Sequence, residues 1–287
     1  MFEILKKELL ATDIYLMEVY APRMALTAQP GQFLIVRADN HGERVPLTIA
    51  GYNREKGTIT IVTQALGVST KKIVALKESD SFANFAGPLG IPSELVHMSK
   101  GELKNLRVLF VAGGVGAAPI FPQVRFMFEN GARSDVVLGS RSKELTIFRK
   151  ELTEVSNRIF IATNDGSEGM KGFVTDVISN LVETDGEKYD MVVCIGPMIM
   201  MKAVTDLTRK LNIKTIASLN SLMVDGTGMC GACRVTVGGK TKFTCVDGPE
   251  FDAHQVDFDE AMRRMGMYKT EEKKKLMDDH DCRIGLN

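Results

Sequence analysis

Arg107-Val-Leu-Phe-Val-Ala-Gly-Gly-Val-Gly-Ala-Ala-Pro119 is the stretch of this chain that constrains the fold most tightly. Its apolar half, Arg107–Ala112, predicts a buried strand, and the helical stretch Ile120–Glu129 follows the glycines. A strand, a glycine turn and a helix in this order let backbone amides at the helix start bind a pyrophosphate. Pro119 stands where the usual dinucleotide-binding pattern has its third glycine. The alternative interpretation is a tight turn that only packs the helix against the sheet.

Downstream of this loop, apolar runs alternate with helical stretches, which favours a parallel α/β sheet. The strands predicted there are Asp135–Leu138, Arg158–Ala162, Met191–Ile195 and Lys214–Leu219. Upstream of it, short runs separated by turn residues favour a small antiparallel barrel or sandwich. The strands predicted upstream are Gln32–Ala38, Arg44–Ala50 and Thr58–Thr63. The polar segment Pro92–Asn105 is predicted to link the two blocks.

The composition is that of an ordinary globular protein, with 44% hydrophobic and 25% charged residues. A length of 287 residues favours two domains with a small third one. Because 36 basic residues balance 36 acidic ones, no net field attracts nucleic acid or an anionic membrane. The charged N-terminus does not have the pattern of a signal peptide, and nowhere do about 18 apolar residues run together. These features predict a cytoplasmic protein.

Three cysteines and one aspartate near the C-terminus form the pattern Asp225-x4-Cys230-x2-Cys233-x11-Cys245. Plant-type [2Fe–2S] centres are held by a C-x4-C-x2-C…C run, and here a carboxylate takes the first place. Five cysteines in a chain of this length do not make a disulfide framework, which favours metal ligation in a reducing compartment. We predict that Asp225 and Cys230 serve one iron and that Cys233 and Cys245 serve the other.

Two other interpretations fit the same residues. Structural zinc on Cys230, Cys233, Cys245 and His254 has suitable ligand types, since Cys-x2-Cys is common in zinc sites. Asp225-Gly226 is a strong turn dipeptide, so Asp225 could be a turn residue and not a ligand. Cys282 has no second cysteine in motif spacing and is predicted not to bind metal.

Two features of the N-terminal block suit a diphosphate group. Arg44 begins a predicted strand, and a guanidinium binds a diphosphate through two parallel hydrogen bonds. Gly67-Val68-Ser69-Thr70 opens a helical stretch whose hydroxyls and amides could bind the same group from the other side. Each feature alone also has a structural explanation, since Arg44 fits a solvated strand residue and Ser69 an ordinary helix cap.

Together these motifs resemble the ferredoxin-NADP reductase superfamily, in which a flavin barrel precedes a pyridine-nucleotide domain. Arg44-x-Pro46-Leu47-Thr48 stands in for the family's R-x-Y-[ST], with Leu47 in place of the flavin-stacking tyrosine. Gly67-x-Ser69-Thr70 stands in for its G-x-G-T, with Ser69 in place of a glycine. The resemblance implies that the chain binds FAD. The FAD-binding residues that it implies are Arg44, Val45, Pro46, Leu47, Thr48, Ile61, Val62, Thr63, Gly67, Ser69 and Thr70.

Two later segments resemble the family's nicotinamide-nucleotide motifs. Asn164-Asp165-Gly166-Ser167-x-Gly169 is similar to D-G-S-x-G, and Ile195-Gly196-Pro197-x-x-Met200-Met201 is similar to C-G-P-x-x-M-M. Cys194 lies one residue before the family's cysteine position, so strand alternation should turn it into the core. Arg141 occurs in NAD and NADP users alike and leaves the nucleotide open. The NAD-binding residues that the resemblance implies are Gly114, Val115, Gly116, Pro119, Arg141, Asp165, Gly196, Pro197 and Met198.

The order of barrel, nucleotide domain and iron–sulfur segment resembles the electron-transfer subunit of class 1B dihydroorotate dehydrogenase. Asp225 in place of the first cysteine resembles the small subunits of NADH-dependent reduced ferredoxin:NADP oxidoreductase, an electron-bifurcating flavoprotein. The resemblance implies an oxidoreductase subunit that passes electrons between NAD(H), FAD and a [2Fe–2S] cluster. It also implies a larger partner subunit with FAD and [4Fe–4S] clusters that handles NADPH and ferredoxin. No catalytic side chain is predicted, because hydride transfer takes place at FAD.

The chain is therefore predicted to be a multi-domain β plus α/β protein. Its predicted parts are an FAD-binding β-barrel (1–100), an NAD-binding α/β domain (101–218), a [2Fe–2S] cluster domain (219–256) and a tail that contacts the partner (257–287). Met262, Met265, Met267 and Met277 could cover that interface, although Met-rich helices also fill cores. We expect a heterodimer that meets ferredoxin only through its partner, with no nucleic acid and no membrane. The alternatives are the dihydroorotate dehydrogenase subunit and, in another class, a zinc-stabilised nucleotide-binding regulatory module.

Overall fold

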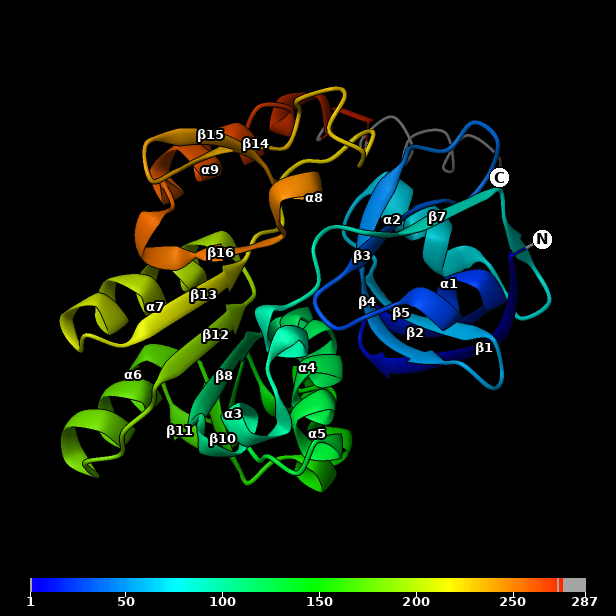
Figure 1. The fold of residues 1–287 in the computed structure, drawn as a ribbon. Helices are drawn as coiled ribbons and strands as arrows, with labels where there is room; N and C mark the ends of the chain where they lie inside the picture. Colours follow the sequence, from blue (N-terminus) through cyan, green and yellow to red (C-terminus); the bar gives the residue numbers. More distant parts are fainter. Residues whose placement is uncertain (1, 273, 276–287) are drawn as a thin grey trace.

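Two seven-stranded sheets carry the fold, and a two-stranded hairpin follows them. The computed structural model describes residues 2–272, 274 and 275. Figure 1 shows the first sheet and its helices on one side of the molecule, the second sheet on the other, and the C-terminal segment above the second sheet and beside the barrel. The predicted order of an antiparallel barrel followed by a mainly parallel α/β domain is confirmed.

The first sheet is antiparallel throughout and has the strand order β6-β1-β2-β5-β4-β3-β7. Its elements are β1 (Phe2–Ala11), β2 (Ile14–Tyr20), α1 (Pro22–Thr27), β3 (Phe33–Arg37), β4 (Val45–Asn53), β5 (Thr58–Gln64), α2 (Val68–Ala75), β6 (Ser81–Phe82) and β7 (Asn84–Leu89). Alternate residues of β5, such as Ile59 and Ile61, are fully buried in the barrel core. The sheet therefore curls around one apolar interior, as the alternating pattern predicted.

The second sheet has the order β11-β10-β9-β8-β12-β13-β16, and only β16 runs antiparallel to its neighbour. Its strands are β8 (Val108–Gly113), β9 (Asp135–Ser140), β10 (Arg158–Thr163), β11 (Met170–Lys171), β12 (Met191–Ile195), β13 (Lys214–Ser218) and β16 (Glu250–Asp252). The helices are α4 (Ala117–Glu129), α5 (Arg149–Val155), α6 (Val174–Ser179) and α7 (Met198–Lys210), with short turns η2 (Gly114–Gly116), η3 (Lys143–Leu145) and η4 (Asn180–Thr184). Helices α4 and α5 cover the sheet face toward the barrel, and α6 and α7 cover the other face (Figure 1).

The segment Pro92–Asn105, predicted as a linker, is folded. It contains the short helix η1 (Glu94–His97) and helix α3 (Lys100–Asn105). Ser99 and Glu102 cap α3 reciprocally, and Leu95 and Leu103 are buried against the second sheet. Its two apolar anchors are too far apart to give the periodic signal of a long helix, which explains why the sequence pattern suggested a loop.

The C-terminal segment is tied to both sheets. It contains the hairpin β14 (Arg234–Val237) and β15 (Lys240–Phe243), helix α8 (Thr244–Asp247), the turn η5 (Ala253–Gln255) and helix α9 (Phe258–Met265). Gly238 and Gly239 both have positive φ at the hairpin turn, as a type I′ turn requires. Strand β16 then pairs with β13, so the segment after the cysteines completes the second sheet. Residues 276–287, with Met277 and Cys282 of the predicted tail, lie outside the described residues.

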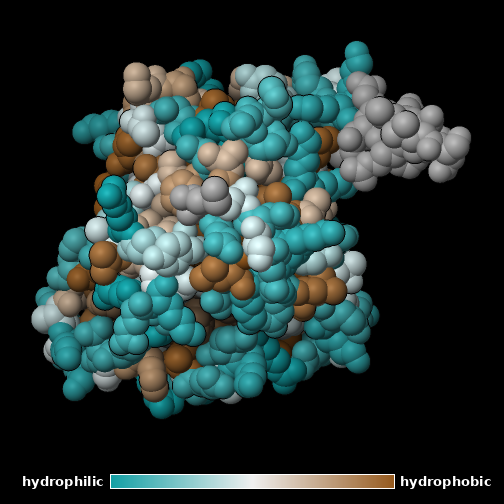
Figure 2. All heavy atoms as spheres, turned by 90° about the vertical axis from the view of Figure 1, so that its right-hand side faces the viewer, coloured by the Kyte–Doolittle hydropathy of each residue, from teal (hydrophilic) through white to brown (hydrophobic). Residues whose placement is uncertain are grey.

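The surface and the helix lengths add two observations. Among the described residues on the face that Figure 2 shows, hydrophilic side chains predominate and apolar ones form small separate groups. In the described part of the chain, every helix is too short or too polar to span a bilayer.

Candidate functional site

The glycine loop lies at the carboxyl edge of the parallel strands. Gly114–Gly116 forms the turn η2 between β8 and α4, next to β9 and to β5 of the barrel. Pro119 is in the first turn of α4, where the amide that proline lacks would have no intrahelical partner. Gly114 has φ +55, and a Cβ there would meet no heavy atom within 4 Å, so the loop leaves open space at its tip. Such a strand–turn–helix edge suits a pyrophosphate.

The loop after β12 packs directly against the glycine loop. A Cβ on Gly116 would lie 2.2 Å from the Ile195 carbonyl oxygen, and one on Gly113 would lie 3.0 Å from Pro197 Cδ. The sheet order places β8 between β9 and β12, so successive strands are added toward one edge of the sheet before this point and toward the other edge after it, while all three strands stay parallel. In open α/β sheets this switch point is where ligands bind. Met198, the first residue of α7, is buried, whereas Ile199 in the same turn is 71% exposed.

The other two predicted nucleotide residues lie farther along the same edge. Arg141 follows β9 and Asp165 follows β10, and the Asp165 amide donates to the Arg141 carbonyl at 3.2 Å. The Asp165 carboxylate accepts hydrogen bonds from the Ser167 amide and hydroxyl, and these bonds lower its pKa. The edge therefore brings together the loops that carry Gly114, Arg141, Asp165 and Gly196.

The residues predicted to contact the flavin ring lie on two neighbouring strands. Val45–Thr48 form the half-buried first part of β4, and Ile61–Thr63 lie on β5, which pairs with β4. Thr63 is 2% exposed, and within the described residues its hydroxyl has no hydrogen-bond partner. A buried hydroxyl without a partner costs about 1–3 kcal/mol, so the strand pair fits a polar ligand that would supply one.

The start of α2 is arranged partly as predicted. Thr70 Oγ1 accepts from the Leu66 and Gly67 amides at 3.0 and 2.9 Å, which closes the turn before the helix. Ser69 donates its hydroxyl hydrogen to the Glu43 carboxylate, and Glu43 also pairs with Lys275 at 2.5 Å. Both contacts lower the pKa of Glu43. Ser69 would therefore have to leave Glu43 before it could donate to a phosphate.

Arg44 lies just before β4 and contacts the cluster segment. Its Nε donates to the Val224 carbonyl at 3.0 Å, and its Nη2 donates to the Asp225 carbonyl at 3.2 Å. These bonds span 180 positions of sequence and tie the flavin barrel to the loop that carries Asp225. Sequence reasoning assigned Arg44 to a diphosphate and missed this second role, because no local pattern reports so distant a contact.

Two of the cysteines are buried side by side against the barrel. Cys233 and Cys245 are each 2% exposed, and their Sγ atoms lie 3.2 Å apart. They pack in one apolar cluster with Phe33 and Ile35 of β3. Phe33 and Ile35 pair directly with Thr48 and Pro46 of β4. The two thiols thus pack on β3, the direct neighbour in the sheet of the strand predicted to hold the flavin ring.

Hydrogen bonds fix this thiol pair. The Thr244 amide and hydroxyl both donate to the Cys233 carbonyl, at 3.1 and 2.9 Å. Burial, and then the neighbouring Cys233 thiol, raise the pKa of Cys245. Two adjacent buried thiols can both lose their protons and bind one iron as thiolates. This pair of donors therefore fits half of a [2Fe–2S] cluster.

Asp225 and Cys230 form the second pair, on the outer side of the loop. Asp225 Oδ2 accepts from the amides of Thr227 and Met229 and from the Thr227 hydroxyl, and these bonds lower its pKa. The exposed Cys230 thiol has its pKa lowered by the Ala232 amide and then by the Asp225 amide. In the described residues no hydrogen bond reaches Asp225 Oδ1. An ionised carboxylate with one free oxygen is suited to bind iron.

Glycines allow the loop to take this path. Gly226 has φ +84, and a Cβ there would lie 2.9 Å from Ile35 Cγ1 of the barrel. A side chain at this position would force the loop off β3, and L-residues rarely adopt that φ. The close contact explains why Asp225 is followed by glycine.

The zinc interpretation disagrees with the position of His254. This residue lies in η5, and its Nε2 is 3.3 Å from Thr208 Oγ1 on α7. Nowhere in residues 2–272, 274 and 275 do three or more His, Cys, Asp or Glu side chains converge on one metal position. The pair Cys233 and Cys245 and the pair Asp225 and Cys230 could each bind one iron of a [2Fe–2S] cluster.

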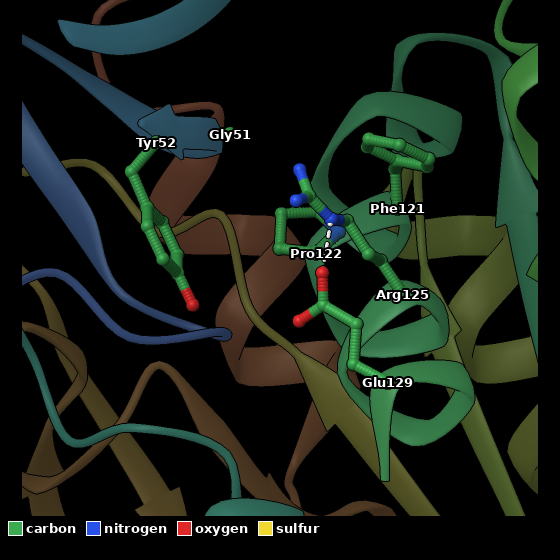
Figure 3. A pocket seen from close by; sticks show the side chains of 6 residues that line it. All are labelled: Gly51, Tyr52, Phe121, Pro122, Arg125 and Glu129. Atoms are coloured by element: carbon green, nitrogen blue, oxygen red, sulfur yellow. Dashed lines mark hydrogen bonds and ion pairs between the residues drawn. The ribbon is translucent and has the colours of Figure 1, made fainter. Parts of the chain in front are cut away.

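A small pocket between the barrel and α4 is not part of this site. It has a volume of about 40 Å³ and lies between Gly51 and Tyr52 of β4 and Phe121, Pro122, Arg125 and Glu129 of α4 (Figure 3). Arg125 donates to Glu129 at 2.7 Å across its mouth. Cofactor pockets are roughly ten times larger. Cys194 is likewise outside the site, since it is fully buried in the core as predicted.

Two family models match the two C-terminal parts of the chain. One is described as the iron-sulfur cluster binding domain of dihydroorotate dehydrogenase B and matches residues 220–257. The other is described as an oxidoreductase NAD-binding domain and matches residues 110–206.

Whole-chain comparisons agree with these models. A homolog of the dihydroorotate dehydrogenase B electron transfer subunit from Thermotoga maritima is 42% identical over 94% of this chain and 93% of its own length. The corresponding subunit from Shouchella clausii is 35% identical over 88% of this chain and 96% of its own length. A solved structure of NADH-dependent reduced ferredoxin-NADP oxidoreductase is 40% identical, with a TM-score of 0.89 over 97% of both chains.

Proposed function

This chain belongs to the family of dihydroorotate dehydrogenase B electron-transfer subunits and their homologues, and from that membership we propose that it serves a bifurcating transhydrogenase. It is an oxidoreductase subunit with FAD, a [2Fe–2S] cluster and NAD(H) as cofactors. We propose that its partner is a larger subunit that handles NADPH and ferredoxin. The three reduced cysteines of the cluster segment favour a cytoplasmic location.

One observation carries the choice of the bifurcating enzyme. The solved NADH-dependent reduced ferredoxin-NADP oxidoreductase, studied for flavin-based electron bifurcation, matches 97% of both chains with a TM-score of 0.89. Asp225 at the first ligand position supports the same choice, because class 1B dihydroorotate dehydrogenases are expected to have cysteine there. The electron-transfer subunit of dihydroorotate dehydrogenase B remains the second candidate, since several relatives carry that name.

The arrangement of residues suits an electron relay. When bound, FAD supplies the conversion between a two-electron hydride and single electrons. The loops with Gly114 and Gly196 would hold the nucleotide at the edge that faces β5, while Arg44, Thr48 and Thr63 would hold the flavin. Cys233 and Cys245 would hold one side of the cluster within the apolar surroundings of Phe33 and Ile35 on β3.

We propose four parts with the predicted boundaries 1–100, 101–218, 219–256 and 257–287, with one qualification. Strand β16 belongs to the cluster segment in sequence and to the nucleotide sheet in space. We further propose Asp225, Cys230, Cys233 and Cys245 as the cluster ligands. Their support is the two-plus-two arrangement of these side chains and the match of residues 220–257 to the iron-sulfur model.

Isolation of the native complex tests the proposed partner. The chain should be tagged in its host and purified anaerobically, and the copurified larger subunit identified. We expect the complex to reduce NADP with reduced ferredoxin and NADH together. Oxidation of dihydroorotate by the complex, without NADPH activity, would instead support the second candidate.

The control for this experiment is a variant that loses only the cluster. Cys233→Ser should remove the cluster and leave FAD bound, so that the complex keeps NADH-dependent reduction of its own flavin but loses electron delivery to the partner. Unchanged delivery in this variant would exclude the cluster from the path.

A further inference from the structure

Arg264 of α9 contacts the cluster loop, the segment from Val224 to Cys233 that carries Asp225, Cys230 and Cys233. Its Nη2 donates to the Ala232 carbonyl at 3.1 Å, one residue before the buried Cys233. The same helix holds the neighbouring hairpin, because Glu260 accepts the Thr236 amide at 3.1 Å. Arg264 is thus placed by a helix that is itself anchored to the cluster segment.

Another nitrogen of the Arg264 side chain has no partner among the described residues. Its Nε is buried and has no hydrogen-bond partner among the described residues. No carboxylate forms an ion pair with Arg264 in that part of the chain. An unpaired buried donor is destabilising, and here it belongs to a half-buried cation. Such a group is expected where a negatively charged ligand completes the site.

A second guanidinium lies on the other flank of the loop. Arg44 donates to the carbonyls of Val224 and Asp225, and Arg264 donates to the carbonyl of Ala232. Each arginine therefore bonds the backbone at or beside a proposed ligand, one from the barrel and one from α9. Because Arg44 is also proposed to bind FAD, its substitution would affect both the flavin and the cluster segment. Arg264 therefore gives the cleaner test.

We propose that Arg264 is a positioning residue that holds the Cys233 side of the cluster loop and raises the reduction potential of the cluster. This inference rests on the proposed [2Fe–2S] site. The step concerned is the addition of one electron from the flavin of the same chain, with no bond formed or broken and no proton moved. Reduction adds one negative charge to the cluster, and a nearby partly buried cation stabilises the reduced state more than the oxidised state.

The test is a redox titration of the purified, FAD- and cluster-loaded chain, followed by the EPR signal of the reduced cluster. We expect Arg264→Gln to shift the reduction equilibrium about tenfold toward the oxidised cluster, or about 59 mV for one electron. Arg264→Lys keeps the charge and should stay close to the wild type. The matched control is Arg263→Gln, since Arg263 is the exposed neighbour on the same helix and its charge is screened by water. The flavin midpoint serves as an internal reference that should not move.

Each outcome bears on the inference. A cluster potential in Arg264→Gln equal to that in Arg263→Gln would overturn it, as would an equal shift in Arg264→Lys. If Arg264→Gln does not retain iron, Arg264→Lys decides, because restored charge must restore both the cluster and its potential. Iron and sulfide absent from the wild-type chain would instead refute the proposed cluster site itself.

Discussion

Asp225 is the residue that distinguishes this chain within its family. Its pKa is lowered by the Thr227 hydroxyl and amide, so the carboxylate is ionised at neutral pH and able to bind iron. A carboxylate is a harder and weaker electron donor than a thiolate, and replacing thiolate ligands is one way in which cluster potentials rise.

We therefore predict that Asp225→Cys retains the cluster and lowers its reduction potential by at least roughly 60 mV, a tenfold change for one electron. Redox titration with EPR detection measures this. Asp185→Cys, an exposed aspartate outside the cluster segment, is the matched control and should leave the potential unchanged. If Asp225→Cys has the wild-type potential, Asp225 is a turn residue and not a ligand.

At the same scale, the sequence predicted which residues belong to each motif but not what they touch. The cysteine spacing indicated a cluster because ligand spacing is a local property. The bond from Arg44 to Val224 and the free Arg264 Nε depend on packing between segments far apart in sequence. Ser69 was predicted from its position in a helix cap, whereas its contact with Glu43 comes from the neighbouring loop.

At the scale of elements, the glycine turn between β8 and α4 is the feature on which nucleotide binding depends. Gly116 lies so close to the Ile195 carbonyl that any side chain must displace the loop. We predict that Gly116→Ala weakens NADH binding at least about tenfold, while the visible bands of FAD and cluster persist. Titration calorimetry with NADH measures the change.

Gly101→Ala is the control for this prediction. Gly101 lies in α3, and a Cβ there meets only Ser99 Oγ at 3.9 Å. Alanine should stabilise that helix by about 0.5–1 kcal/mol and leave NADH affinity unchanged. Equal NADH affinity in the two variants would show that the glycine loop does not bind the nucleotide.

Strands were predicted correctly from the sequence where all their residues are buried, and they were missed where few residues are buried. The strands β8 and β12 are buried along their whole length, so their apolar runs were visible in the sequence. In β1 only Ile4 is fully buried, and the charged residues Glu3, Lys6, Lys7 and Glu8 do not alternate with apolar ones, so no alternation indicated a strand. β16 has three residues and forms only because β13 offers an edge, which no local pattern reports.

At the scale of the whole molecule, Glu250 joins the cluster segment to the nucleotide domain and to the segment that connects it to the barrel. Its Oε1 accepts from Gln123 of α4 at 2.6 Å, and Gln123 in turn accepts from Ser93 at 3.2 Å. Burial raises the pKa of Glu250 to about 7, the nearby Glu94 carboxylate adds to the increase, and the hydrogen bonds from Ser93 and Gln123 oppose it.

This raised pKa predicts a pH-dependent stability. The folded chain binds the Glu250 proton more tightly than the unfolded chain, whose pKa is near 4.5. Protonation of Glu250 therefore adds about 3 kcal/mol to the free energy of unfolding. This contribution is fully present below pH 4.5 and is lost as the pH rises through 7. We expect Glu250→Gln to melt at a higher temperature than the wild type at pH 8 and to lose this advantage near pH 5. A constant difference across that range, or the same behaviour in the exposed control Glu154→Gln, would contradict the prediction.

Anaerobic titration of the isolated chain with NADH, followed by visible and EPR spectra after iron, sulfide and zinc analysis, tests the central claim most directly. We expect two irons and two sulfides per chain, bleaching of the flavin band by NADH, and the EPR signal of a reduced [2Fe–2S] cluster. Zinc in place of iron, or a chain that holds both cofactors while NADH reduces neither, would contradict it.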